Sequence, residues 1–114
     1  MERALARRER VGFDPDRLGA LYDRLGPEGA GAALAGARDL LAERLAALAA
    51  VPVDRTDLLA RAGRGLVGVA EEIGMTTLAR VAADLSVAAG RGDRAAAGAV
   101  RSRLMRVGAA SLSG

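Results

Sequence analysis

The chain has 114 residues, enough for one domain that folds without cross-links, and it contains neither cysteine nor histidine. All 17 basic residues are arginine, so the commonest general base, the lysine nucleophile and the commonest transition-metal ligands are absent, and we expect no enzyme, catalytic residue, metal or cofactor. The net charge is +3, and the charged residues are scattered along the chain. Phe13 and Tyr22 are the only aromatic residues. Both features argue against a nucleic-acid partner, because proteins that bind nucleic acids concentrate positive charge and stack bases on aromatic rings.

The first 12 residues, MERALARRERVG, form a basic arm that we divide from a helical domain over residues 13–114. No apolar run follows the arm to form the core of a signal peptide. No window of the chain has the roughly 18 uninterrupted apolar residues of a membrane span. We therefore expect a cytoplasmic protein with no membrane partner.

Helical periodicity runs through the rest of the chain, without convincing strand alternation. A short helix begins with Asp14 as its N-cap and Pro15 at its first helical position, and it ends near Gly26-Pro27. A second helix over about 28–50 repeats apolar residues at three- and four-residue steps, which predicts a core-facing stripe. This stripe comprises Leu34, Ala37, Leu41, Leu45 and Leu48.

Three more helices follow, separated by short turns. Val51-Pro52-Val53 ends the helix over 28–50. We expect Asp54 to cap the next helix and Gly74 to end it. Thr76 or Thr77 is the expected cap of the next helix, and Asp93 that of the last. Core stripes are predicted at Leu78, Val81, Leu85 and Ala88, and then at Ala96, Val100, Leu104 and Val107. Because short turns make neighbouring helices antiparallel, the expected fold is an all-α, antiparallel four-helix bundle with a short N-terminal helical extension.

The helix expected over about residues 54–74 is unusual in its glycine content. An interior glycine costs a helix about 0.5–1 kcal/mol relative to alanine. On a helical wheel Gly63 and Gly65 flank the core stripe around Leu66, so we expect them to allow close helix packing. Gly68 lies on the opposite, solvent-facing side, which indicates that something outside the bundle approaches the helix there. Asp57, Arg61, Arg64 and Glu71 share this exposed side.

Residues 64–74, RGLVGVAEEIG, resemble the signature of histidine-containing phosphotransfer (HPt) domains, the four-helix bundles of bacterial phosphorelays. That signature runs His-x-Leu-Lys-Gly-x-Ala-x-x-x-Gly, and this chain keeps its leucine, its alanine and both of its glycines. Residues 78–93, LARVAADLSVAAGRGD, look like the helix and Gly-Asp turn that follow the signature in the family. The resemblance covers roughly residues 13–110.

The chain departs from the family at the reactive position. Arg64 stands where the family has its phosphorylated histidine, and Val67 stands where it has a lysine. Arginine keeps its proton and offers no lone pair to attack an aspartyl phosphate. The resemblance therefore implies a pseudo-HPt module, a monomer or weak dimer, that binds a response-regulator receiver domain or a histidine kinase without accepting phosphate. The expected partner-binding residues are Arg64, Gly68, Val67, Arg61, Glu71 and Ala60.

Other interpretations remain open at this point. An exposed arginine such as Arg64 is equally compatible with solvated surface, and Glu71-Glu72 is better explained as solvated charge than as a pair of metal ligands, since adjacent helical side chains diverge by about 100°. One alternative is a domain that only senses a partner phosphorylated by another route. A second functional class is a helical scaffold or dimerisation protein, unconnected with phosphorelay, that uses Arg3, Arg7, Arg8 and Arg10 of the basic arm.

Overall fold

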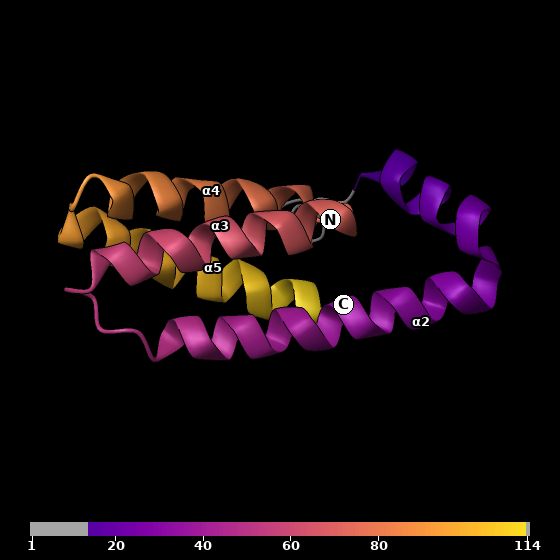
Figure 1. The fold of residues 1–114 in the computed structure, drawn as a ribbon, viewed down its shortest axis with the longest axis horizontal. Coiled ribbons are helices and arrows are strands. Elements are labelled where there is room, and N and C mark those ends of the chain that lie inside the picture. The colour runs from indigo at the N-terminus through magenta and orange to yellow at the C-terminus, as the bar shows by residue number, and fades with distance from the viewer. Residues whose placement is uncertain (1–13, 114) are drawn as a thin grey trace, which may run out of the picture.

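A computed structural model describes residues 14–113, which form four α-helices and no strand (Figure 1). The helices are α2 (Pro15–Ala49), α3 (Thr56–Glu72), α4 (Thr76–Gly90) and α5 (Arg94–Ser113). The expected all-α bundle is confirmed at this level. The predicted basic arm, residues 1–12, lies outside the described part of the chain.

Helix α2 is two helical segments joined at a sharp bend. Gly26 adopts φ 75° and ψ 172°, a non-helical conformation that glycine tolerates and other residues rarely adopt. Pro27 follows it and cannot continue the helical hydrogen bonds across the bend. The predicted break at Gly26-Pro27 is therefore confirmed. In Figure 1 the first segment projects beyond the end of the bundle and the second runs back along α3 and α5. The backbone N–H of Asp14 donates to the carbonyl of Gly74 at 2.7 Å, which attaches the start of α2 to the turn between α3 and α4.

Two of the four predicted helix caps form. The Asp14 carboxylate accepts hydrogen bonds from the backbone N–H groups of Asp16 at 3.0 Å and Arg17 at 3.4 Å, and Pro15 occupies the first helical position. At the start of α5 the Asp93 carboxylate accepts from the N–H of Ala96 at 3.0 Å. Both residues satisfy donors that the first helical turn leaves without partners.

The predicted caps at Asp54 and at Thr76 or Thr77 are wrong. Helix α3 begins at Thr56 with Arg55 at the cap position, so Asp54 lies one residue too early to reach the first-turn N–H groups. Met75 occupies the cap position of α4, which places both threonines inside the helix. Neither cap residue makes a side-chain capping hydrogen bond.

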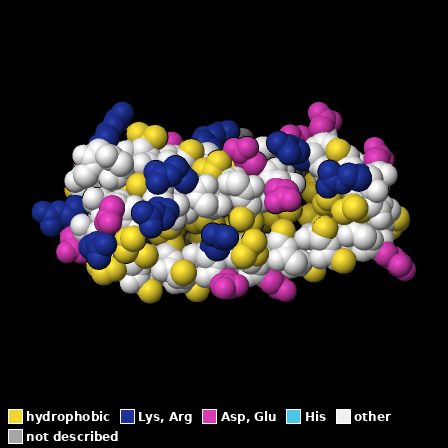
Figure 2. Space-filling view, in the orientation of Figure 1, with side chains coloured by type: hydrophobic (Ala, Val, Ile, Leu, Met, Phe, Trp, Pro, Cys, Tyr) yellow, Lys and Arg dark blue, Asp and Glu magenta, His cyan; other side chains and the backbone are white. Residues whose placement is uncertain are grey.

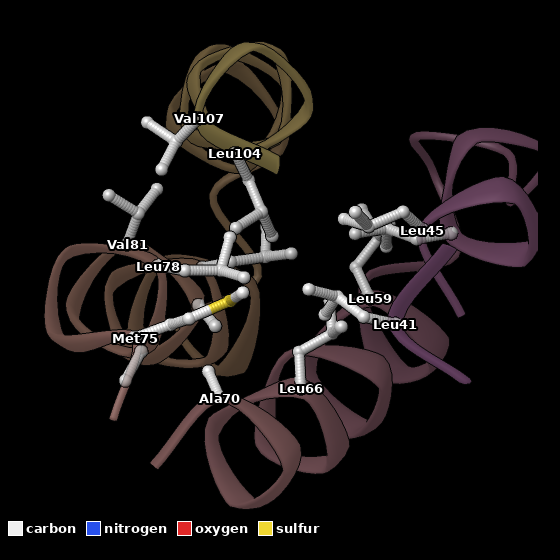
Figure 3. Close-up of a cluster of buried hydrophobic side chains, with 14 of the residues drawn as sticks. Leu41, Leu45, Leu59, Leu66, Ala70, Met75, Leu78, Val81, Leu104 and Val107 are labelled. Carbon is white, nitrogen blue, oxygen red and sulfur yellow. The ribbon is translucent and has the colours of Figure 1, made fainter. Parts of the chain in front are cut away.

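Leucine, valine, methionine and alanine side chains from all four helices meet in one core (Figure 3). The predicted stripes are confirmed at their centres, and Leu34, Ala37 and Val100 are partly buried at the edge of the core. The prediction is wrong at Ala88 and Ala96, which are only partly buried and lie outside the core, because their neighbours Ala89 and Ala97 take the buried positions. Small residues bring the helices close together, since a Cβ on Gly108 of α5 would lie 2.5 Å from Leu45 Cδ1 of α2. The labelled core residues are Leu41 and Leu45 of α2, Leu59, Leu66 and Ala70 of α3, Met75, Leu78 and Val81 at and after the start of α4, and Leu104 and Val107 of α5.

Two arginines connect α2 to α5, one at the carboxyl end of each helix. The guanidinium of Arg101 donates to the carbonyls of Leu48 and Val51, where α2 ends. Arg38 of α2 donates to the carbonyl of Leu112 near the end of α5. A positive charge at a helix C-terminus satisfies free carbonyls and complements the helix dipole. These bonds hold the second segment of α2 along the bundle.

Candidate functional site

The face of α3 that points away from the core carries most of the predicted partner-binding residues. Arg61, Arg64, Gly68 and Glu71 are exposed, and Val67 is partly buried at the margin of the core. Spacings of three and four residues along one helix place these side chains on adjoining positions of one surface. Sequence periodicity was sufficient to predict this face, because it is the complement of the buried stripe.

Ala60 does not belong to this surface, and its prediction as a partner-binding residue is wrong. Its side chain is 5% exposed and forms part of the core. Ala60 precedes Gly63 by one helical turn, on the flank of α3 that packs against α4. A helical wheel places this flank at the boundary between core and solvent. It is buried because α4 packs closely against it.

The glycines of α3 have three different surroundings. A Cβ on Gly63 would lie 2.9 Å from the carbonyl oxygen of Ala82 and 3.0 Å from the backbone nitrogen of Ser86, so this glycine is required by the close approach of α4. A Cβ on Gly65 would meet only the end of the Arg44 side chain, at 3.3 Å. Around Gly68 there is open space, with nothing within 4 Å. Packing within the bundle thus explains Gly63 and leaves Gly68 unexplained.

A shallow hollow of about 350 Å³ adjoins the α3 face, where α3, α4 and the start of α2 meet. Val67 and Glu71 form its α3 side, so the structure brings two predicted site residues together here. Arg17 of α2 and Arg80 of α4 each add a positive charge to its lining. Sequence reasoning missed both arginines because their position depends on how the helices are arranged, which no local pattern records. The remaining lining residues are Asp14, Gly74, Thr76, Ala79 and Ala83.

The charges of the α3 face are mostly unpaired. Residues 14–113 contain one ion pair with its charged atoms within 4 Å of each other. It joins the guanidinium of Arg55 to the carboxylate of Asp57 at 3.2 Å. The hydrogen bond from the Arg55 side chain lowers the pKa of the Asp57 carboxyl below its ordinary value. Arg61 and Arg64 have no carboxylate of residues 14–113 within that distance, so both guanidiniums are available to a partner.

Chemical groups for other kinds of site are sparse over residues 14–113. In this range no three acidic side chains gather closely enough to hold a metal ion. None of its helices combines the length and the apolar character needed to cross a bilayer. The exposed α3 face, with its glycine and its free guanidiniums, is therefore the strongest candidate for a functional surface in the described chain.

Comparison with known proteins adds no relative: no protein-family model, curated protein or solved structure matches this chain. The resemblance to HPt domains rests on the residues of α3 and on the order of the helices and turns.

Proposed function

We propose that this protein is a pseudo-HPt signalling module that binds a receiver domain or a histidine kinase through the exposed face of α3 and does not itself accept phosphate. The observation that carries the proposal is Gly68 on the same exposed helix face as the guanidiniums of Arg61 and Arg64, which are unpaired within residues 14–113. Gly31 of α2 is equally open, but no arginine lies within four residues of it along its helix. Gly68 stands in the middle of a helix, exposed, with nothing within 4 Å of an added Cβ. It costs helix stability and returns no packing within the described bundle.

The missing side chain at Gly68 is useful to a partner. A bare stretch of helix lets another protein's backbone approach more closely than alanine or any larger residue permits. In the family that the sequence resembles, this position gives a receiver domain the space to bring its aspartate near the helix. The exposed surroundings of Gly68 support the same use here.

Arg64 supports binding in place of phosphate transfer. It lies one turn before Gly68, is exposed, and has no carboxylate of the described residues within 4 Å. Its planar guanidinium forms paired hydrogen bonds with carboxylate or phosphoryl oxygens, which suits the acidic pocket of a receiver domain. The same group has no lone pair for nucleophilic attack, and the whole chain has no histidine that would replace it.

Titration calorimetry of the full chain tests this proposal against the receiver domains and kinases encoded near its gene. We expect micromolar affinity for one of them and no detectable binding by the Gly68→Arg variant, because the new side chain fills the space the partner needs. Gly31→Arg is a matched control, since Gly31 is also exposed and helical with no neighbour within 4 Å of an added Cβ. The control should bind like the unmodified chain.

Two results would count against the proposal. One is the absence of binding to every receiver and kinase. The other is an equal loss of affinity in both arginine variants, which would show that added charge, and not the filling of the Gly68 space, is responsible. Deletion of residues 1–10 separates the remaining alternative, because a scaffold that acts through its basic arm loses binding with the arm.

A further inference from the structure

Arg44 of α2 lies across the backbone of α3. Its Nη1 atom is 3.3 Å from the position of a Cβ on Gly65, so the guanidinium lies close against α3 at this residue. Arg44 comes from the second segment of α2, the part that runs along the bundle. The α3 face therefore continues onto α2 across the junction of the two helices, which the sequence alone does not indicate.

Two arginines of α3 extend this basic surface: Arg61 lies beside Gly65, and Arg64 lies beside Arg61. Arg61 precedes Gly65 by four residues, which puts their Cβ positions about 5–6 Å apart on one side of the helix. Arg64 points about 100° away from Gly65 around the helix, but it follows Arg61 by three residues and so lies beside it on the exposed face, one turn before Gly68. We call Arg44, Arg61 and Arg64 the junction arginines. On the face drawn in Figure 2, basic side chains are more numerous on the left half than on the right, and acidic side chains lie among them.

Nothing in the described chain neutralises the junction arginines. All three residues are exposed, and none has a carboxylate of residues 14–113 within 4 Å. Asp57, one turn before Arg61 on the same face, is already paired with Arg55. Gathering like charges over a bare helix is unfavourable in the free protein, and a negatively charged group bound among them removes that repulsion.

We propose that the junction arginines bind carboxylates on an acidic surface of a partner protein, with Arg44 as a specificity-determining residue contributed by α2. The partner's identity as a receiver or kinase rests on the proposed function, whereas the acidic chemistry rests on the charges themselves. Protein is favoured over nucleic acid because the described chain offers no aromatic for stacking beside these arginines. Tyr22, its one aromatic residue, lies on the first segment of α2.

The proposal is tested by NMR titration of the full chain with a hexa-aspartate peptide at low salt. Chemical-shift changes should concentrate at the amides of Gly65 and Gly68 and at the side-chain Nε–H groups of the three junction arginines. Arg44→Gln should weaken the peptide's affinity about three- to tenfold. Arg103→Gln is the control, because Arg103 is an exposed arginine of α5 without a hydrogen bond or ion pair in the described structure, and it should leave the affinity unchanged.

Either of two results overturns the proposal. Shift changes spread equally over the arginines of α5 would show general attraction of an anion to a basic protein. Equal affinities of Arg44→Gln and the unmodified chain would remove Arg44 from the site. A parallel titration with single-stranded DNA should give weaker binding, and tighter binding of DNA than of the peptide at the same residues would contradict the assignment to an acidic protein.

The receiver titration separates this inference from the function on which it partly rests. If no receiver or kinase binds while the peptide still maps to the junction arginines, the acidic-surface proposal stands and the phosphorelay proposal fails. If a receiver binds, is blocked by Gly68→Arg and is indifferent to Arg44→Gln, the proposed function stands and the role of Arg44 fails.

Discussion

Gly63 and Gly68 belong to the same helix and have opposite surroundings, so the same substitution should have opposite effects at the two positions. A methyl group at Gly63 meets the backbone of α4 at 2.9 Å, which neither helix can relieve without moving. We expect Gly63→Ala to lower the free energy of unfolding by about 1–3 kcal/mol. Gly68→Ala meets nothing and should raise it by about 0.5–1 kcal/mol.

Urea denaturation of the two variants measures both effects. The slope of the unfolding free energy with urea should stay the same, so that the shift in midpoint reports stability alone. Destabilisation by Gly68→Ala as well would show that the glycine serves the fold, and it would remove the main reason for placing a partner there.

The exposed pair of Arg55 and Asp57 gives a prediction for pH. Because the hydrogen bond from Arg55 lowers the pKa of the Asp57 carboxyl in the folded chain, the pair stabilises the fold above the ordinary pKa of aspartate. That contribution is lost as the pH falls through the lowered value. Both side chains are more than half exposed, so the effect on stability should be small and weakened by salt.

NMR titration of the Asp57 carboxyl carbon measures this directly. The midpoint should lie below the ordinary aspartate range and return toward it in Arg55→Gln. A midpoint that is the same in both proteins would show that the pair does not form in solution.

At the scale of the helices, the caps provide a matched comparison of two aspartates. Asp93 accepts a hydrogen bond from the first turn of α5, so Asp93→Ala should cost about 0.5–2 kcal/mol of stability. Asp54 makes no capping bond, and Asp54→Ala should change stability much less. Thermal unfolding of the two variants tests this, and equal losses would contradict the observed start of α3 at Thr56.

The same comparison shows how far sequence patterns reach. Apolar periodicity predicts the helices and their buried stripes because a 3.6-residue repeat follows directly from the helix. The bend at Gly26-Pro27 is likewise local, since glycine permits the positive φ and proline ends the ladder of hydrogen bonds. Cap positions are less certain, because a shift of one residue, as at Asp54, moves the carboxylate away from the donors it would satisfy.

Contacts between helices are what the sequence does not reveal. The burial of Ala60 and the position of Arg44 over Gly65 both depend on how closely a second helix approaches α3. The same is true of Arg17 and Arg80, which reach the hollow beside Val67 from two other helices. The α3 face was predictable as a surface, whereas its neighbours on α2 and α4 required the structure.

For the molecule as a whole, the bundle combines a closely packed interior with an exposed α3 face on which Gly68, Arg61 and Arg64 lie together. Gly63 and Gly108 serve close approach within the bundle, and the carboxyl ends of α2 and α5 are satisfied by arginine side chains. Against this background, the free guanidiniums and the exposed glycine of α3 are the features that call for a partner. The proposed module would then bind a partner at the face that resembles the phosphate-transferring face of HPt domains.

The most direct test of this account is a phosphotransfer assay with a radiolabelled receiver domain that binds the chain, comparing the unmodified protein with Arg64→His/Val67→Lys. We predict no label on the unmodified protein, which lacks an acceptor at Arg64, and slow labelling of the double variant, in which the α3 face regains a histidine beside Gly68. Label on the unmodified chain would contradict the claim that it binds without accepting phosphate. Failure of a receiver that binds the double variant to label it would contradict the claim that α3 presents an HPt-like docking face.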